Sequence, residues 1–189
     1  MKLLLVDNYD SFTYNLVNIL RKSKHLSIDV QQSRDVRLEK VKDFDKVLFS
    51  PGPDVPHEFD IMAQILAAYQ NKKSILGICL GFQAIGLYYG AKLTNLNTVH
   101  HGISVSISPC VPVDKLFKGI ESPFSAGLYH SWGITEEAFP AAVRITAKST
   151  DGRIMALTHR DFDVRGVQFH PESVMTPEGS KLLRNWIDL

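Results

Sequence analysis

The sequence predicts an α/β protein with an open, mainly parallel sheet, helices on both faces and an antiparallel addition in the C-terminal half. Short apolar runs alternate with helical patterns through the first 90 residues, which is typical of βαβ units. The second half instead shows patterns of paired strands. With 189 residues, 44% of them hydrophobic and 22% charged, the chain is expected to form one domain over residues 1–189.

The first strands are predicted by continuous apolar runs. Leu3 to Val6 is such a run between polar residues, typical of a strand buried on both faces. Further strands are expected over residues 27–31 and 46–49. The polar segment Ser50-Pro51-Gly52-Pro53 then interrupts the chain where the third strand ends.

Two helices are predicted between these strands. In the turn after the first strand, Asp10 or Ser11 is expected to cap a helix. The second helix is expected over residues 58–70. The apolar faces are formed by Phe12, Leu16, Ile19 and Leu20 in the first helix, and by Phe59, Met62, Leu66 and Tyr69 in the second.

The stretch from Ser74 to Gln83 predicts a buried strand that runs directly into a helix, with Cys79 at the corner. Gly77 and Gly81 flank this cysteine at the spacing of a nucleophile elbow. Glycines there permit the close backbone approach of a strained turn. The start of a helix also favours a thiolate. The alternative is a buried structural cysteine.

The second half is predicted to be mostly strands. Residues 94–112 show alternating and turn patterns without a clear helix. Residues 141–159 are typical of antiparallel strands that turn at Asp151-Gly152. A strand over residues 164–169 ends at His170-Pro171-Glu172. Thr176-Pro177 is expected to start a final helix. Its apolar face is Leu182, Leu183, Trp186 and Ile187.

Composition argues against several classes of function. The net charge of +1 gives no reason to expect nucleic acid or an anionic membrane as a partner. Two cysteines make a disulfide framework unexpected and suit a reducing cytoplasm, and Cys110 is expected to be structural. The N-terminal apolar run is too short for a signal peptide or a membrane span. His100 and His101 are expected at the surface, with no metal and no cofactor.

Candidate chemistry gathers at the ends of the predicted strands, where open α/β sheets bind ligands. A nucleophilic cysteine needs a base, and His170 follows an apolar strand directly. Glu172 lies on the same side of an extended segment and is expected to orient the imidazole. The alternative for this His-x-Glu pair is a solvated strand end. With the elbow present, we expect a triad of Cys79, His170 and Glu172.

Such a triad requires backbone N–H groups that stabilise an oxyanion. Leu80, the residue after the nucleophile, is the expected first donor. Gly52 is the expected second donor, because a glycine between two prolines brings its N–H close to a ligand. The alternative for this segment is an ordinary turn.

The motifs around these residues resemble the signatures of class I (triad-type) glutamine amidotransferases. These motifs are Gly77-Ile78-Cys79-Leu80-Gly81-Phe82-Gln83, Ser50-Pro51-Gly52-Pro53 and Gly166-Val167-Gln168-Phe169-His170-Pro171-Glu172-Ser173. The stretch from Asp7 to Asn15 resembles one branch, the glutaminase components of anthranilate synthase and of aminodeoxychorismate (para-aminobenzoate pathway) synthase. The similarity spans nearly the whole chain.

This resemblance implies that the chain hydrolyses glutamine and delivers ammonia to a partner. Gln83 and the pair Ser131-Trp132 would hold the α-amino and carboxylate groups of glutamine. The amidotransferase domain takes up the whole chain, so a separate subunit that acts on chorismate is implied. Asp10 and Ser11 lie where coupling to that subunit is expected.

Four positions depart from the usual pattern of this branch. Asp54 stands where a glycine is usual, and Trp132 where a leucine is usual. Ile103 and Leu128 replace a lysine and an arginine. Loss of these cations would alter any salt bridges with the partner, so the sequence does not define the partner interface. None of these residues belongs to the expected triad.

Two other functions remain open on the sequence. One is a stand-alone hydrolase of γ-glutamyl compounds, and the other is a non-catalytic regulatory subunit. Within the chorismate-using branch, the sequence leaves three products open: anthranilate, aminodeoxychorismate or both.

Overall fold

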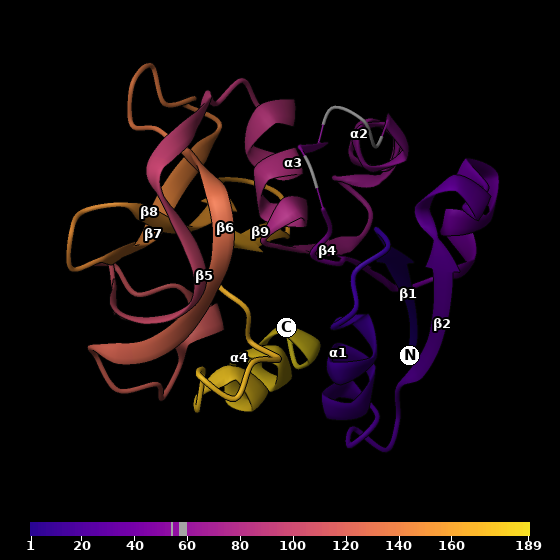
Figure 1. Cartoon of the computed structure of the whole chain (residues 1–189). Coiled ribbons are helices and arrows are strands. Elements are labelled where there is room, and N and C mark those ends of the chain that lie inside the picture. The colour runs from indigo at the N-terminus through magenta and orange to yellow at the C-terminus, as the bar shows by residue number, and fades with distance from the viewer. Residues whose placement is uncertain (54, 57–59) are drawn as a thin grey trace.

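The computed structural model describes residues 1–53, 55–56 and 60–189, and in this part of the chain the strands form one sheet (Figure 1). Its strand order is β2-β1-β3-β4-β9-β8-β7-β5-β6. The strands are β1 (Lys2–Asp7), β2 (Ser27–Gln32), β3 (Lys46–Phe49), β4 (Ser74–Ile78), β5 (Leu93–Pro109), β6 (Phe124–Ile134), β7 (Val143–Ser149), β8 (Ile154–His159) and β9 (Val164–Val167).

Five neighbouring strands, β2-β1-β3-β4-β9, pair in parallel, and the remaining pairs are antiparallel. The expected parallel sheet with an antiparallel addition is therefore confirmed. The strands expected at 3–6, 27–31 and 46–49 are β1, β2 and β3. The expected turn at Asp151-Gly152 joins β7 to β8, and Gly152 has a φ of 86°.

The helices cover both faces of the parallel half (Figure 1). They are α1 (Thr13–Leu20), α2 (Asp60–Tyr69), α3 (Leu80–Tyr88) and α4 (Gly179–Ile187). Side chains alternate along β1: Leu3 and Leu5 pack with α1 and α4, whereas Leu4 and Val6 pack with α2 and α3. Burial on both faces explains why β1 is a continuous apolar run.

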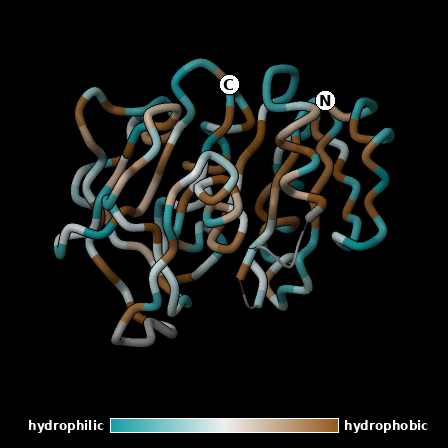
Figure 2. The backbone as a smooth tube through the Cα atoms, turned by 90° about the horizontal axis from the view of Figure 1, so that it is seen from above, coloured by the Kyte–Doolittle hydropathy of each residue, from teal (hydrophilic) through white to brown (hydrophobic). Residues whose placement is uncertain are grey.

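The hydropathy of the backbone follows this layering. Figure 2 shows hydrophobic segments mainly in the interior of the fold and hydrophilic segments mainly in the loops at its periphery. Among the described residues, no helix is long and apolar enough to cross a membrane.

The long strand β6 was not predicted from the sequence. It pairs with β5 along the whole strand: Phe124 lies opposite Ile107 at one end and Ile134 lies opposite Leu93 at the other, with register shifts between them. Its burial does not alternate: Ala126, Gly127 and Leu128 are all buried in succession. The period-2 signal is therefore lost, and glycines at 127 and 133 weaken it further.

The expected cap of the first helix is wrong. Phe12 occupies the N-cap position and makes no side-chain cap hydrogen bond. The Asp10 carboxylate accepts the Phe12 N–H instead, at 2.8 Å, in a turn that precedes the helix. Phe12 is 39% exposed and does not belong to the buried face of α1 with Leu16 and Leu20.

The expected start of the last helix also differs, whereas that of the second helix is not tested. Thr176 and Pro177 lie in a turn closed by the Gly179 N–H and the Thr176 carbonyl, and α4 begins only at Gly179. The Thr176 hydroxyl donates to the His170 carbonyl at 2.7 Å and accepts from the Gly127 N–H. The second helix begins at Asp60, and the expected positions 58 and 59 lie outside the described residues.

Candidate active site

Cys79 lies on a strained turn between β4 and α3, as the sequence predicts. Its φ of 51° and ψ of −99° are unusual for a residue with a side chain. A Cβ atom on Gly77 would collide with the Gly81 backbone, and one on Gly81 would lie 2.6 Å from the Phe49 carbonyl oxygen. Both flanking glycines are therefore required by the tight contact between β4, α3 and β3.

His170 and Glu172 follow β9, the strand that neighbours β4. The Cys79 N–H donates to the Val167 carbonyl at 2.8 Å, so the cysteine turn and the end of β9 are directly joined. The Nδ1 atom of His170 lies 2.6 Å from Oε1 of Glu172, and 4% and 1% of the two side chains are exposed. This pair is not a solvated strand end.

The electrostatics of His170 favour its protonated form. Burial alone lowers the pKa of His170. The Cys79 sulfur and the Glu172 carboxylate raise it by more than burial lowers it, so the net pKa lies well above the ordinary value of 6.5. Apart from its interaction with the Cys79 sulfur, Nε2 of His170 has no hydrogen-bond partner within the described part of the chain. With Nδ1 held by Glu172, Nε2 is the nitrogen left for proton transfer.

A cavity of about 140 Å³ opens over the cysteine. Its lining residues are Gly52, Pro53, Cys79, Leu80, Gln83, Tyr129, His130, Ser131 and Trp132. Residues from three separate sequence segments therefore meet at this cavity. All the candidate oxyanion and glutamine-binding residues are among them, and the ring of Tyr129, which also lines the cavity, contacts His170.

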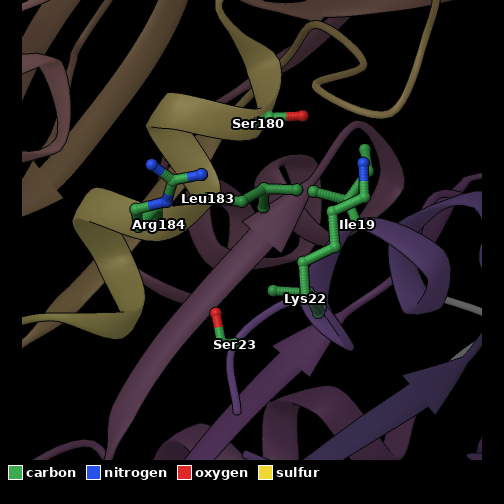
Figure 3. Close-up of a pocket in the computed structure, with 7 residues that line it drawn as sticks. Ile19, Lys22, Ser23, Ser180, Leu183 and Arg184 are labelled. Atoms are coloured by element: carbon green, nitrogen blue, oxygen red, sulfur yellow. The ribbon is translucent and has the colours of Figure 1, made fainter.

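Other hollows lie away from these residues. One of about 460 Å³ includes Asp114, Arg144 and Arg165 and opens at the amino end of β9, opposite His170. A cavity of about 90 Å³ lies in the seam between α1 and α4, where Ile19 and Leu183 point toward one another (Figure 3). Neither contains a residue of the expected triad.

Gly52 is fixed by a residue that the sequence analysis did not assign to the site. The Asn8 N–H donates to Ser50 Oγ at 2.9 Å, and the Asn8 side-chain amide donates to the Ser50 carbonyl at 3.0 Å. A Cβ atom on Gly52 would lie 2.7 Å from the Asn8 carbonyl oxygen and 2.7 Å from Leu80 Cδ2. Gly52 and Leu80, the two expected oxyanion donors, are therefore close to each other in space.

Gln83 joins the expected substrate-binding residues to β9. Its Nε2 donates to the Trp132 carbonyl at 2.8 Å and to Gln168 Oε1 at 3.1 Å. Trp132 therefore contributes its backbone carbonyl to this network, and Ser131 lines the cavity beside it. Gln168 was also missed, although it lies in the motif around His170.

Asp10 and Ser11 lie at the edge of the site. Burial raises the pKa of Asp10, while the Phe12 N–H and His170 lower it and Glu172 and Asp7 raise it. Asp10 is therefore within electrostatic reach of the His170–Glu172 pair, whereas Ser11 is exposed. Phe12 contacts the Tyr129 ring at 5.8 Å between centroids, and Tyr129 contacts His170 edge-on at 4.9 Å.

The departures from the usual pattern fall in different environments. Leu128 is fully buried in the core beside Ala126, so it cannot alter salt bridges at a surface, whereas Ile103 is 37% exposed. Asp54 lies outside the described residues, as do the side chains of His100 and His101.

Cys110 is a free, half-buried cysteine. Within the described side chains, no group of three His, Cys, Asp or Glu residues has the arrangement of a metal site.

An open α/β sheet that carries a cysteine on a strained strand–helix turn, close to a buried His–Glu pair, has the arrangement that cysteine acyl transfer requires. The family model described as "Glutamine amidotransferase class-I" matches residues 4–189. The chain belongs to this family of glutamine amidotransferases.

Relatives agree with this assignment, and a solved structure agrees with the fold. The chain is 40% identical over 192 residues to anthranilate synthase component 2 of Thermus thermophilus, covering 100% of this chain and 92% of the relative. It is 35% identical over 188 residues to the aminodeoxychorismate/anthranilate synthase component 2 of Bacillus subtilis, covering 98% and 95%. A glutamine amidotransferase structure from Thermotoga maritima has the same fold, with a TM-score of 0.76, 17% identity and coverage of 100% of this chain and 81% of that one.

Proposed function

We propose that the chain is the glutaminase subunit of a chorismate-using synthase and that Cys79, His170 and Glu172 are its catalytic triad. The observation that carries this proposal is the juxtaposition of the cysteine turn and the buried His–Glu pair: the Cys79 N–H donates to the end of β9, His170 and Glu172 directly follow that strand, and Cys79 lines the cavity. Family membership supports glutamine as the substrate.

In the proposed reaction, the Cys79 sulfur attacks the side-chain amide carbon of glutamine. The N–H groups of Gly52 and Leu80 stabilise the negative charge that develops on the amide oxygen. His170, protonated at Nε2, donates its proton to the departing nitrogen as the carbon–nitrogen bond breaks, and ammonia leaves. His170 then accepts a proton from the water that hydrolyses the γ-glutamyl thioester, which releases glutamate and the free cysteine.

Glu172 orients His170 throughout this cycle. Its Oε1 atom accepts the Nδ1–H at 2.6 Å, which fixes the tautomer and stabilises the imidazolium. Because both side chains are buried, little water competes for this hydrogen bond.

The same cavity is proposed to hold the other end of glutamine. Both N–H bonds of Gln83 are directed to the protein, so its carbonyl oxygen is the atom available to accept from the α-amino group. Ser131 and Trp132 are proposed to bind the α-carboxylate, because both line the cavity beside Gln83. No cofactor is required for these steps.

The proposed partner is a synthase subunit that binds chorismate and uses the ammonia, so that the active assembly is a heteromer. Support comes from the names of the relatives, which describe component 2 of anthranilate or aminodeoxychorismate synthases. Asp10 and Ser11 are proposed to couple the partner to the triad. Two free cysteines suit a cytoplasmic location. We propose that residues 1–189 act as one amidotransferase domain.

The experiment that tests this function starts from the complex purified from its native source through a tag on this subunit. The complex receives chorismate and glutamine labelled with ¹⁵N at the side-chain amide, and the aminated product is identified by mass spectrometry. Labelled anthranilate or labelled aminodeoxychorismate supports the proposal and distinguishes the two products. If a partner is bound and neither product forms, the chorismate assignment is wrong.

A control reaction contains ¹⁵N-ammonium in place of glutamine and measures the synthase step alone. A second control contains this subunit without its partner. Rapid glutamine hydrolysis there, with no aminated product in the complex, would support a stand-alone γ-glutamyl hydrolase instead.

A further inference from the structure

Gln168 is a fully buried polar residue that the proposed mechanism does not use, and it lies against the nucleophile. Its Nε2 atom is 3.6 Å from Cys79 Sγ, within hydrogen-bond distance for sulfur. Its backbone N–H donates to the Met155 carbonyl at 2.9 Å, which anchors the residue beside β8. The side chain therefore reaches the sulfur from a fixed position.

The direction of this amide group follows from its neighbours. The Trp132 carbonyl can only accept a hydrogen bond, so the Gln83 atom that faces it must be the nitrogen. The second N–H of that nitrogen points to Gln168, so the Gln168 atom that receives it must be the oxygen. The nitrogen of Gln168 is consequently the atom that faces the sulfur.

We propose that Gln168 is a positioning residue that holds Cys79 Sγ by an N–H···S hydrogen bond, with its direction set by Gln83 and the Trp132 carbonyl. This inference rests on the proposed role of Cys79 as the nucleophile. A buried donor restricts where the sulfur lies and stabilises its negatively charged form. It also connects the nucleophile to the wall that is proposed to bind glutamine.

The test measures the rate at which iodoacetamide alkylates Cys79 between pH 5 and 9.5. Cys110 is replaced by serine in every protein, so only Cys79 reacts. The titratable groups around the sulfur are the same in every protein: His170, which interacts with Cys79, and Glu172 and Asp10, which interact with His170. In Gln168→Met, which keeps the length but removes the donor, we expect the pH midpoint of alkylation to rise by about one unit, the effect of one hydrogen bond to a charged group.

Gln168→Glu keeps the shape and still accepts from Gln83, but it presents an oxygen to the sulfur. It therefore provides a folded variant if Gln168→Met does not fold, and its midpoint is expected to rise at least as far. The matched control is Gln31→Met, on the edge strand β2, which is expected to keep the midpoint of the parent. A merely structural role would change the melting temperature and leave the midpoint in place.

An unchanged midpoint in either folded Gln168 variant would overturn the inference. The assay contains neither glutamine nor a partner, so it is separate from the test of the proposed function. If the parent complex uses glutamine and the midpoints coincide, only the role of Gln168 is wrong. If the midpoints differ and the complex makes no product from glutamine, Gln168 still positions Cys79 and the proposed function is wrong.

Discussion

The Nδ1 atom of His170 lies 2.6 Å from Oε1 of Glu172, and both side chains are almost completely buried. This hydrogen bond leaves Nε2 as the nitrogen that can exchange a proton with the reacting groups. It also helps to raise the pKa of His170, against the opposing effect of burial. The pair therefore gives the proposed glutaminase a proton donor that is charged near neutral pH.

Replacing Glu172 with glutamine tests the orienting role of this carboxylate. An amide cannot stabilise the imidazolium and can turn its NH₂ toward Nδ1, which favours the wrong tautomer. We expect Glu172→Gln to lower the glutamine-dependent kcat of the complex by about 10²- to 10⁴-fold. The control is Glu178→Gln, at the start of α4. Activity within twofold of the parent would remove Glu172 from the mechanism.

Replacing Gly52 with alanine tests the second oxyanion donor. The added Cβ would lie 2.7 Å from the Asn8 carbonyl and from Leu80 Cδ2, so the loop must shift and carry its N–H away. We expect Gly52→Ala to lower kcat about 10²-fold, the effect of one lost donor. In Gly133→Ala the added atom would meet Leu96 at an ordinary distance of 3.7 Å, so this matched control should retain activity. A Gly52→Ala enzyme with the parent kcat would rule out this donor.

Phe12 offers a test of coupling to the partner. This exposed ring contacts Tyr129, which contacts His170, so a surface residue reaches the triad through two ring contacts. We expect Phe12→Ala to reduce the stimulation of glutamine hydrolysis by the partner about 5- to 10-fold, in the range of typical coupling energies. Tyr14→Ala, in the first turn of α1 and 62% exposed, is the control. Equal stimulation in both variants would contradict a route through Phe12.

Lys46 predicts a pH dependence of stability. Its Nζ donates to the Trp186 carbonyl at 2.9 Å and to Ser74 Oγ at 3.2 Å. Burial and Arg165 lower the pKa of Lys46 from 10.5 to about 8, although Asp188 and Asp45 raise it. Between these two values the unfolded chain binds the extra proton, so the free energy of unfolding rises with pH there, by about 3 kcal/mol in full.

Urea unfolding of the parent and of Lys46→Met at pH 7.5, 8.5 and 9.5 measures this dependence. The parent is expected to gain stability relative to Lys46→Met as the pH rises, because the variant lacks the titrating group. Groups common to both proteins cancel in the difference. A constant difference across this range would show that Lys46 titrates normally.

The sequence predicts the parallel half of the fold well because β1, β3 and β4 are buried on both faces and therefore appear as apolar runs. It fails for β6, where buried residues stand in succession and the alternating signal is lost. It also misplaces the start of α1, since Asp10 accepts the Phe12 N–H in a turn before the helix. Short-range patterns do not distinguish such a turn from a helix cap.

Prediction of the site divides in the same way. Cys79, His170 and Gly52 lie in motifs whose spacing has a local physical reason. Asn8 and Gln168 act through contacts with residues 42 and 89 positions away in the sequence, which only the folded chain brings together. The buried position of Leu128 likewise depends on the pairing of β6.

The most direct test of the central claim compares Cys79→Ala with the parent in the purified complex, supplied with chorismate and either glutamine or ammonium. We expect Cys79→Ala to abolish product formation from glutamine and to leave formation from ammonium near the parent rate, because only the glutaminase step needs the sulfur. Product formation from glutamine at the parent rate would show that Cys79 is not the nucleophile.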